Sequence, residues 1–292
     1  MTDNDWLAER FEEHRDHLRA VAYRMLGSLA DADDAVQDTW LRSSRAGAAD
    51  VENIGGWLTT IVARVSLNML RSRKTRREEA FDMGIPDPVV SPDSGVDPEH
   101  EAVLADSVGL ALLVLLDTLS PAERLAFVLH DMFDLPFDEI APMIDRSPTA
   151  ARQLASRARR RVRGAASPNA DVVRQREVVD AFFAAARSGN LDALVSVLDP
   201  DVVLRADGGP GHPATAVVHG ARNVAGRALR FANPAAVLHP ALVNGTAGVV
   251  VTVDGRPFSV MGFTVADGRI VEIDAVAGPE RLGRLDLSAF VS

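Results

Sequence analysis

The chain has 292 residues, about twice the length of a common domain, so two or three domains are expected. Its composition, with 47% hydrophobic and 25% charged residues, excludes a disordered or fibrous chain, and the absence of cysteine excludes disulfides, thiolate metal sites and thiol nucleophiles. The net charge of −10 argues against nucleic-acid binding by the chain as a whole.

Positive charge is nevertheless concentrated in two segments. Residues 64–77 hold five Arg and one Lys, and residues 146–163 hold seven Arg, with no acidic residue in either. Affinity for a polyanion follows the local field, so this distribution is typical of local nucleic-acid docking. The alternative is that arginines at helix ends form solvated faces.

The first piece of the chain, from about Trp6 to Glu79, is expected to be helical. Apolar residues recur at intervals of three and four over 11–29, and Gly27-Ser28 ends this helix. A second helix over 32–42, capped by Asp31 or Asp33, and a third over 57–73 follow, with a loop over 43–56 between them.

Residues 81–97 are predicted to form a linker, because four prolines and two glycines in 81–98 prevent a long helix or a central strand. The next piece, 99–163, is again helical. Ser120 is expected to cap a helix with Pro121 at its first position and Glu123 closing a capping box. A short helix over 137–144 and a final helix that begins at Ser147-Pro148 then form a helix-turn-helix.

The final helix of this motif has two different faces. Small and apolar residues fall on one face and are expected to pack inward, whereas polar and basic residues project from the other. Early small or hydrogen-bonding residues suit the DNA major groove, and later arginines suit phosphates. The residues expected to contact DNA are Ser147, Thr149, Arg152, Gln153, Ser156, Arg157 and Arg160.

The third piece changes from a helical to a strand-like pattern. Helices are expected over 172–186 and 191–198, followed by strands over 202–205, 215–218, 248–253, 258–265 and 270–276. Asp254-Gly255 and Asp267-Gly268 predict hairpin turns between the last three strands. We therefore expect an α+β domain with a curved antiparallel sheet and a cone-shaped cavity between helices and sheet.

Several motifs together resemble the extracytoplasmic-function sigma factors of bacterial RNA polymerase. In the first piece they are Tyr23-Arg24-Met25-Leu26-Gly27, the acidic run 31–38 and the segment 57–64. In the second piece they are Leu119-Ser120-Pro121-Ala122-Glu123-Arg124, the segment 137–141 and the run from Ser147 to Arg163. They keep the family's order and spacing over about 160 residues.

The resemblance implies a role for each piece. It implies that the chain binds core RNA polymerase through its β′ clamp and β flap, and that it binds promoter DNA. The residues implied to grip the clamp are Asp33, Asp34, Gln37, Asp38 and Leu41. The helix over 57–77 and the loop before it are implied to open and read the downstream promoter element, through Asn53, Trp57, Arg64, Asn68, Arg71, Arg73 and Lys74, although Trp57 could equally be a core residue.

The whole chain resembles the subgroup of these factors that carries a C-terminal SnoaL-like domain of the NTF2-like fold. The match is carried by Gly84-Ile85-Pro86-Asp87-Pro88, Asp207-Gly208-Gly209-Pro210-Gly211 and Gly278-Pro279-Glu280-Arg281-Leu282. The resemblance implies regulation in cis. The expected contact residues are Pro86, Asp87, Pro88, Asp207, Gly208, Gly209, Pro279, Glu280 and Leu282.

The expected architecture is therefore multidomain, with two all-α sigma domains followed by an α+β NTF2-like cone. The expected boundaries are 1–80, 81–98 for the linker, 99–165 and 171–292. Because no apolar run reaches the roughly 20 residues that span a bilayer and the start of the chain is acidic, a cytoplasmic protein without a membrane partner is expected.

The alternative function is that the C-terminal domain binds or turns over a small ligand in its cavity. NTF2-like cones include isomerases and cyclases, and the acid–base candidates would be Asp207, His212, His219 and Asp274. The preferred interpretation is that the chain is not an enzyme and needs no cofactor or metal, with His14 and His17 solvated on the first helix.

Overall fold

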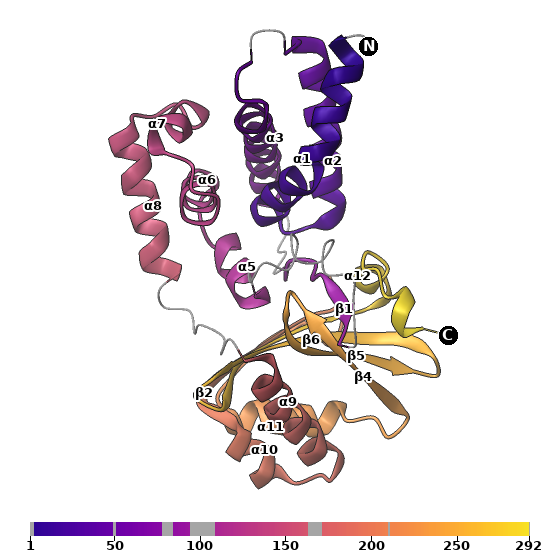
Figure 1. Cartoon of the computed structure of the whole chain (residues 1–292). Coiled ribbons are helices and arrows are strands. Elements are labelled where there is room, and N and C mark those ends of the chain that lie inside the picture. Colours follow the sequence, from indigo (N-terminus) through magenta and orange to yellow (C-terminus); the bar gives the residue numbers. More distant parts are fainter. Residues whose placement is uncertain are drawn as a thin grey trace. The chain divides into compact units, whose positions relative to one another are not determined.

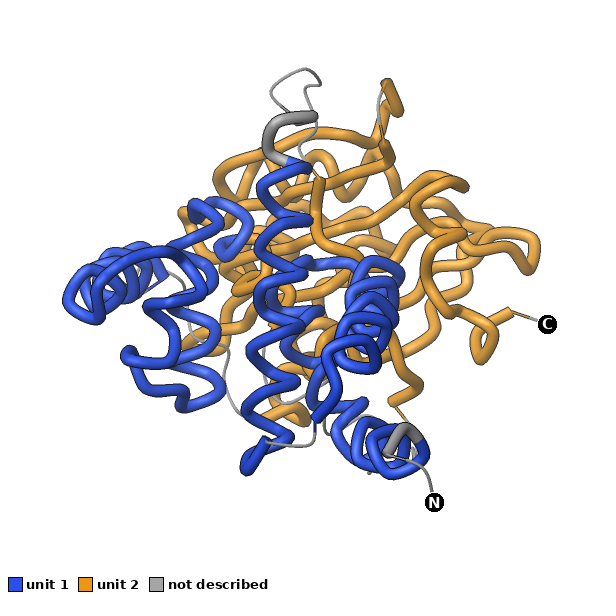
Figure 2. The backbone as a smooth tube through the Cα atoms, turned by 90° about the horizontal axis from the view of Figure 1, so that it is seen from above, with its two compact units in different colours: residues 1–81, 99–104, 115–164 blue, residues 82–98, 105–114, 165–292 orange. Residues whose placement is uncertain are grey.

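The structure, a computed structural model, describes residues 3–48, 51–77, 84–93, 109–162, 171–209 and 211–291 (Figure 1). Its described residues fall into two compact units, coloured separately in Figure 2. The first unit comprises 3–77 and 115–162, and the second comprises 84–93, 109–114 and the residues from 171 onward. The described part of the predicted linker therefore belongs to the unit that contains the C-terminal domain.

Three helices form the first half of the first unit: α1 (Asp3–Leu26), α2 (Leu29–Ala46) and α3 (Ile54–Arg77). All three are longer than predicted, and the loop before α3 is correspondingly shorter. The predicted cap of α2 is wrong, because Ser28 accepts a hydrogen bond from the backbone N–H of Asp31 and neither Asp31 nor Asp33 caps the helix. A hydroxyl one residue before the helix is well placed to accept from its first free N–H groups.

The second half of this unit consists of α6 (Pro121–Phe127), the π-helix η1 (Val128–Met132), α7 (Phe137–Ile140), the 3₁₀ turn η2 (Ala141–Met143) and α8 (Pro148–Val162). The predicted capping box is confirmed, because the Ser120 hydroxyl accepts from the Glu123 N–H while the Glu123 carboxylate accepts from the Ser120 N–H. Ser147 caps α8 by accepting from the N–H of Ala150. The helix-turn-helix expected here is present.

Helix α5 (Leu110–Asp117) is shared between the two units. Leu110 and Val114 pack in a hydrophobic cluster of the second unit, whereas Asp117 pairs with Arg124 of the first at 3.1 Å.

The second unit is built on a seven-stranded sheet. Its strands are β1 (Val90–Pro92), β2 (Leu198–Asp207), β3 (Ala216–His219), β4 (Ala236–Val243), β5 (Thr246–Val253), β6 (Arg256–Ala266) and β7 (Arg269–Ala277), in the order β1-β4-β5-β6-β7-β2-β3. The prediction of a purely antiparallel sheet is wrong, because β2 pairs with β7 in parallel. Chain-distant strands that meet in parallel leave no local turn signal in the sequence.

Helices α9 (Val172–Arg187), α10 (Leu191–Val197) and α11 (Ala221–Phe231) cover one face of this sheet (Figure 1). Phe182, Phe183 and Phe263 meet edge to face in the cluster between helices and sheet. We call this the inner face. Residues on the opposite, outer face form a second cluster with Ile85, Leu110 and the C-terminal segment, whose elements are α12 (Pro279–Leu282) and the 3₁₀ turn η3 (Ser288–Phe290).

In this unit the sequence patterns did not predict β1, β4 and α11, nor the short C-terminal elements α12 and η3. The turn between β4 and β5 is Asn244-Gly245, with positive φ at both residues, and Asn-Gly is a strong hairpin signal that could have located β4. The strand β1 follows prolines that favour extended backbone, and it pairs at the edge of the sheet, where proline is tolerated.

Candidate functional site

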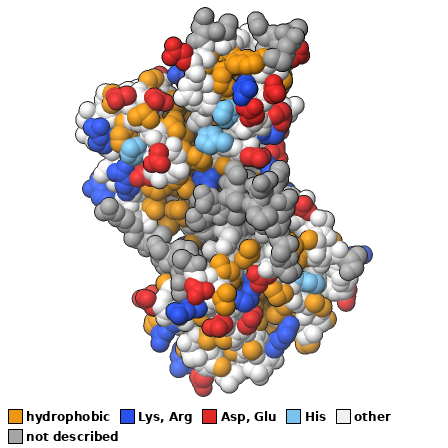
Figure 3. Space-filling view, viewed as in Figure 1, with side chains coloured by type: hydrophobic (Ala, Val, Ile, Leu, Met, Phe, Trp, Pro, Cys, Tyr) orange, Lys and Arg blue, Asp and Glu red, His pale blue; other side chains and the backbone are white. Residues whose placement is uncertain are grey.

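Helix α8 presents the polar face that the sequence predicts. Thr149, Arg152, Gln153, Ser156, Arg157 and Arg160 are all exposed, whereas Ala151, Ala155 and Ala158 are completely buried. Arg side chains lie over this helix in the space-filling view (Figure 3). The predicted division between a packing face and a solvent face is therefore present.

Part of the positive charge of α8 is used inside the unit. Arg159 pairs with Asp131 at 2.5 Å, and Arg157 and Arg161 lie 3.5 and 3.3 Å from Glu123. Burial raises the pKa of Glu123, but hydrogen bonds from Ser120 and the charges of Arg161 and Arg157 hold it below its ordinary value. Arg157, Arg159 and Arg161 therefore pair with carboxylates of the same unit, which is neither DNA contact nor the alternative of a purely solvated face. Gln153 and Arg160 remain the better candidates for DNA contact.

The face of α2 predicted to contact polymerase is open to solvent. Asp33, Asp34, Gln37 and Leu41 are exposed, the last by 44%, and Asp38 is half-buried. Arg19 holds Asp33 at 2.6 Å and Arg42 holds Asp38 at 2.8 Å. The opposite face of α2 is buried, so acidic side chains and an exposed leucine share the remaining surface.

On α3, three of the predicted DNA contacts form one stripe. Arg64, Asn68 and Arg71, which follow one another at intervals of four and three, are exposed. They line an open hollow of about 250 Å³ with Arg42, Leu67, Pro142, Met143 and Asp145. We call Arg64, Asn68 and Arg71 the basic stripe.

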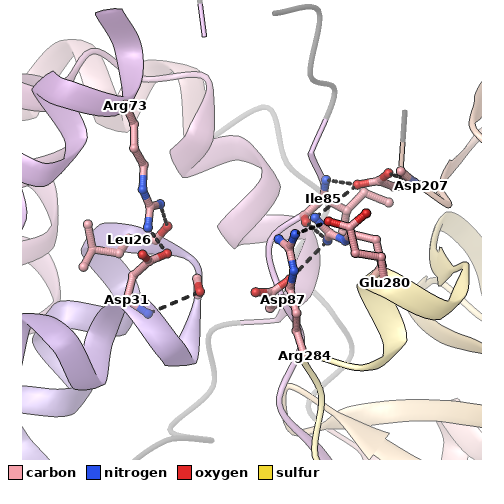
Figure 4. A network of polar contacts seen from close by, with 11 residues as sticks. Leu26, Asp31, Arg73, Ile85, Asp87, Asp207, Glu280 and Arg284 are labelled. Atoms are coloured by element: carbon pink, nitrogen blue, oxygen red, sulfur yellow. Dashed lines mark hydrogen bonds and ion pairs between the residues drawn. The ribbon is translucent and has the colours of Figure 1, made fainter. Parts of the chain in front are cut away.

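The other predicted contacts of this helix lie elsewhere. Asn53 is exposed and accepts a hydrogen bond from Gly56 at the start of α3, and Trp57 is half-buried. Arg73 does not point to solvent as predicted: its guanidinium donates to the carbonyl of Leu26 at 2.9 Å and pairs with Asp31 (Figure 4). It stabilises the C-terminal end of α1, where carbonyls lack helical partners. The side chain of Lys74 lies outside the described residues.

His17 is not solvated as predicted. Its ring lies 3.2 Å from the Thr59 hydroxyl and meets the Phe133 ring edge to face. Burial, together with the nearby His14 and Arg24, holds its pKa below the ordinary value.

The three motifs that carry the resemblance to the C-terminal-domain subgroup meet in the second unit (Figure 4). Arg281 donates to the carbonyl of Ile85 and lies 3.3 Å from Asp87 and 3.4 Å from Asp207. The Asp207 carboxylate also accepts from the N–H of Ile85 at 3.1 Å. All three charged side chains are nearly buried. Arg281, which stands in the third motif but was not chosen as a contact residue, is therefore the centre of this cluster.

The remaining predicted contact residues divide into two groups. Pro86, Pro88 and Leu282 are buried, and Gly208 lies against Gly278, where a Cβ would approach the Gly208 carbonyl to 2.4 Å. Gly209 donates to Asp207 and Pro279 begins α12. Glu280 is different, because it is exposed and pairs with Arg284 at 2.9 Å.

Further contacts hold the linker segment 84–93, which we call the strap. The backbone N–H of Val89 donates to the side-chain oxygen of Asn244 at 3.1 Å, and the backbone N–H of Asn244 donates to the Val89 carbonyl at 2.8 Å. The strand β1 continues this pairing along β4. Arg176 of α9 pairs with Asp93 at 2.8 Å. The strap thus adds a short edge strand to the sheet of the C-terminal domain.

The acid–base candidates of the C-terminal domain do not face its interior. Arg205, Asp207 and Asp274 alternate with Leu204, Ala206 and Ile273 of the inner cluster, so they lie on the outer face. His212 accepts from the N–H of Ala214, and His219 is exposed. The arrangement expected of a catalytic cone is therefore not formed by these residues.

Asp274 makes a testable contribution to stability. Burial raises its pKa to about 6, while Arg205 at 3.3 Å opposes this and Glu272 adds to it. Because the folded state then holds its proton more tightly than the unfolded state, ionisation destabilises the fold as pH rises. Between pH 5 and pH 7.5 this group should remove unfolding free energy on the order of 1 kcal/mol.

Denaturant unfolding of the wild-type chain and Asp274→Asn at several pH values tests this. The difference in unfolding free energy between the two proteins should change by that amount across the interval, in favour of the variant at high pH. A difference independent of pH would contradict the assignment.

Comparison with known proteins identifies the parts. Sigma-70 region 2 matches residues 10–76, Sigma-70 region 4 matches 109–162, and the SnoaL-like domain matches 179–273. The fold and its helix-turn-helix thus define an RNA polymerase sigma factor. We call the helices α1–α3 region 2 and the segment 109–162 region 4.

Two relatives from Mycobacterium tuberculosis extend the match over the whole chain. The probable ECF RNA polymerase sigma factor SigI is 35% identical and covers 98% of each chain, and the ECF RNA polymerase sigma factor SigJ is 38% identical and covers 93% of this chain and 91% of its own. The crystal structure of SigJ has a TM-score of 0.77 at 35% identity, covering 96% of this chain and 99% of that one. The protein belongs to the extracytoplasmic function (ECF) sigma factors that carry a C-terminal SnoaL-like domain, and ECF sigma factors act with core RNA polymerase and promoter DNA.

The described residues contain neither a candidate membrane span nor a candidate metal centre. Within them, no helix is both long and apolar enough to cross a membrane. No cluster of three or more His, Asp or Glu in the same part of the chain is arranged to hold a metal ion.

Proposed function

We propose that the chain reads its promoter through two surfaces, with α8 on the upstream element and the basic stripe on the downstream element. This proposal is supported by the exposure of a polar, basic face on each helix. The opposite face of α8 is made of buried alanines, and the opposite face of α3 packs in the core of region 2. The exposed acidic face of α2, with Leu41, is proposed to bind the β′ clamp of core polymerase, and region 4 is proposed to bind the β flap. The domain boundaries at 80, 98 and 165 are part of the same proposal.

The C-terminal domain is proposed to regulate in cis by holding the strap. The chain between regions 2 and 4 must set the spacing at which they meet two separate promoter elements. While Arg281, Asp207 and Asn244 hold residues 85–92, that segment is fixed on the sheet of the SnoaL-like domain. Binding of core polymerase would then compete with binding of the strap.

The C-terminal tail takes part both in the proposed regulation and in the hydrophobic cluster on the outer face of the sheet. Leu285, Leu287 and Phe290 are buried in the cluster that contains Ile85. Truncation after Gly283 would expose this cluster, and each large buried apolar side chain contributes about 1.5–3 kcal/mol. Single substitutions in the strap contacts therefore separate regulation from folding better than truncation does.

Transcription in vitro with purified core polymerase tests the proposed function. The full chain should direct initiation from promoters selected from a randomised DNA library, and the same chain without α8 should not. Equal promoter selectivity after loss of α8 would refute the assignment of this helix.

A ligand-binding role for the C-terminal domain is the second candidate. The buried Asp274 beside Arg205 gives the outer face of the sheet polar groups that could bind a ligand. However, Arg205 already pairs with both Asp274 and Glu272. Turnover by this domain has no supporting observation.

A further inference from the structure

Arg152 of α8 is held differently from the later arginines of the same helix. Three of those pair with carboxylates of the first unit, which occupies part of their N–H donors. The guanidinium carbon of Arg152 instead lies 5.3 Å from the centre of the Phe137 ring, and the described residues give it no carboxylate partner. Attraction between a cation and a ring face uses no N–H donor. The exposed side chain of Arg152 is therefore held while its donors stay available.

A second ring packs on Phe137 and is itself fixed. Phe137 begins α7 and is 9% exposed, and the centre of the His130 ring lies 3.9 Å from the centre of its ring, with the two planes inclined by 33°. Nδ1 of His130 is 2.9 Å from the carbonyl oxygen of Leu135. A carbonyl only accepts, so Nδ1 donates and the imidazole is tied to the backbone between η1 and α7. We call His130, Phe137 and Arg152 the stack.

The stack lies where a recognition helix reads DNA. Arg152 is the fifth residue of α8, and the N-terminal residues of such a helix contact base edges in the major groove. A guanidinium makes two hydrogen bonds to O6 and N7 of guanine, and these require its plane to be aligned with the base. A long side chain loses rotamer freedom when it docks, and a ring that already orients the side chain reduces this loss.

We propose that Phe137 and His130 are positioning residues for promoter reading. The Phe137 ring, which His130 supports, fixes the Arg152 guanidinium for contact with a guanine edge in the upstream element. This inference rests on the proposed role of α8. All three residues lie in region 4 within the first unit, so neither the strap nor the basic stripe takes part.

Two substitutions at Phe137 separate the effect of its ring from the effect of its bulk. Phe137→Leu keeps an apolar side chain but removes the ring, whereas Phe137→Tyr keeps the ring. Phe231→Leu is the matched control, because it removes the same kind of pair, with Arg227 at 4.7 Å, from α11 of the SnoaL-like domain. Arg152→Ala, alone and combined with Phe137→Leu, completes a double-mutant cycle.

The measurement is competition binding of each holoenzyme to a promoter selected by the wild-type chain and to single base-pair variants of that promoter. Arg152→Ala should relax preference at one base pair. Phe137→Leu should lower preference at that same pair by about two- to fivefold, the loss expected for one cation–π contact, and Phe137→Tyr should retain it. In the Arg152→Ala background Phe137→Leu should cause no further change, and Phe231→Leu should change no preference.

A purely structural role of Phe137 gives a different result. A loss in Phe137→Leu that is spread over all base pairs, or that persists in the Arg152→Ala background, would overturn the proposal, as would equal losses in Phe137→Leu and Phe137→Tyr. If Phe137→Leu fails to fold, as judged by circular dichroism, His130→Asn decides. It keeps a donor for the Leu135 carbonyl but removes the ring, and it should lower the same single preference.

Failure of the stack and failure of the proposed function are distinguishable. Unchanged preference in Arg152→Ala would overturn the base contact of this arginine and the positioning role with it. The proposed role of α8 fails only if a chain without this helix keeps its promoter selectivity.

Discussion

Gln153→Ala and Arg160→Ala in α8 should weaken binding of the holoenzyme to its promoter in two distinguishable ways. Gln153 lies early in the helix and its amide suits a base edge, so its loss should cost about 1–3 kcal/mol and relax preference at one base pair. Arg160 lies later and suits a phosphate, so its loss should weaken binding to all sequences and reduce the slope of log affinity against log salt by about 1.

Competition binding with promoter variants at several salt concentrations measures both effects. Arg187→Ala is the matched control, because Arg187 is an exposed arginine at the end of α9 in the SnoaL-like domain. If Gln153→Ala and Arg160→Ala behave like this control, α8 does not read the upstream element.

Arg281→Met should release the strap and destabilise the second unit. The substitution keeps an apolar chain of similar length but leaves the Asp87 and Asp207 carboxylates, exposed by 7% and 6%, without their shared cation. Removal of one partner from a buried ion pair costs about 3–5 kcal/mol. The amides of residues 84–93 should then exchange with solvent faster, and assembly with core polymerase should become easier because less free energy is needed to detach the strap.

Arg284→Met is the matched control for this prediction. Arg284 lies three residues later and pairs with the exposed Glu280, so its loss should change unfolding free energy by less than about 1 kcal/mol. Equal loss of stability in both variants, or unchanged exchange of the strap in Arg281→Met, would contradict the role given to Arg281.

The sequence predicts best where one local signal decides. The capping box at Ser120, the cap at Ser147, and the inward and outward faces of α8 all follow from residues a few positions apart. The Asp-Gly turns at 254 and 267 likewise locate their hairpins. These features depend on backbone geometry and periodicity, which are properties of short segments.

Features that depend on distant partners were missed or misassigned. The side chain of Arg73 fits a basic DNA-binding run, yet the open carbonyls of α1 and the carboxylate of Asp31 bind it. Asp207 and Asp274 suit acid–base chemistry by type, but strand alternation places them on the outer face. The choice between these roles depends on register and packing, which no local pattern encodes. The resemblance to the subgroup predicts that its three motifs contact one another. That Arg281 lies at the centre of these contacts is evident only from the structure.

Hydrogen exchange of the strap in the free chain and in the holoenzyme tests the mechanism of regulation most directly. In the free chain the amides of Ile85 and Val89 are donated to Asp207 and Asn244, so we predict strong protection there and its loss on binding core polymerase at an active promoter. Retained protection of both amides in a transcribing complex would mean that the strap stays on the SnoaL-like domain, and that its release does not control this sigma factor.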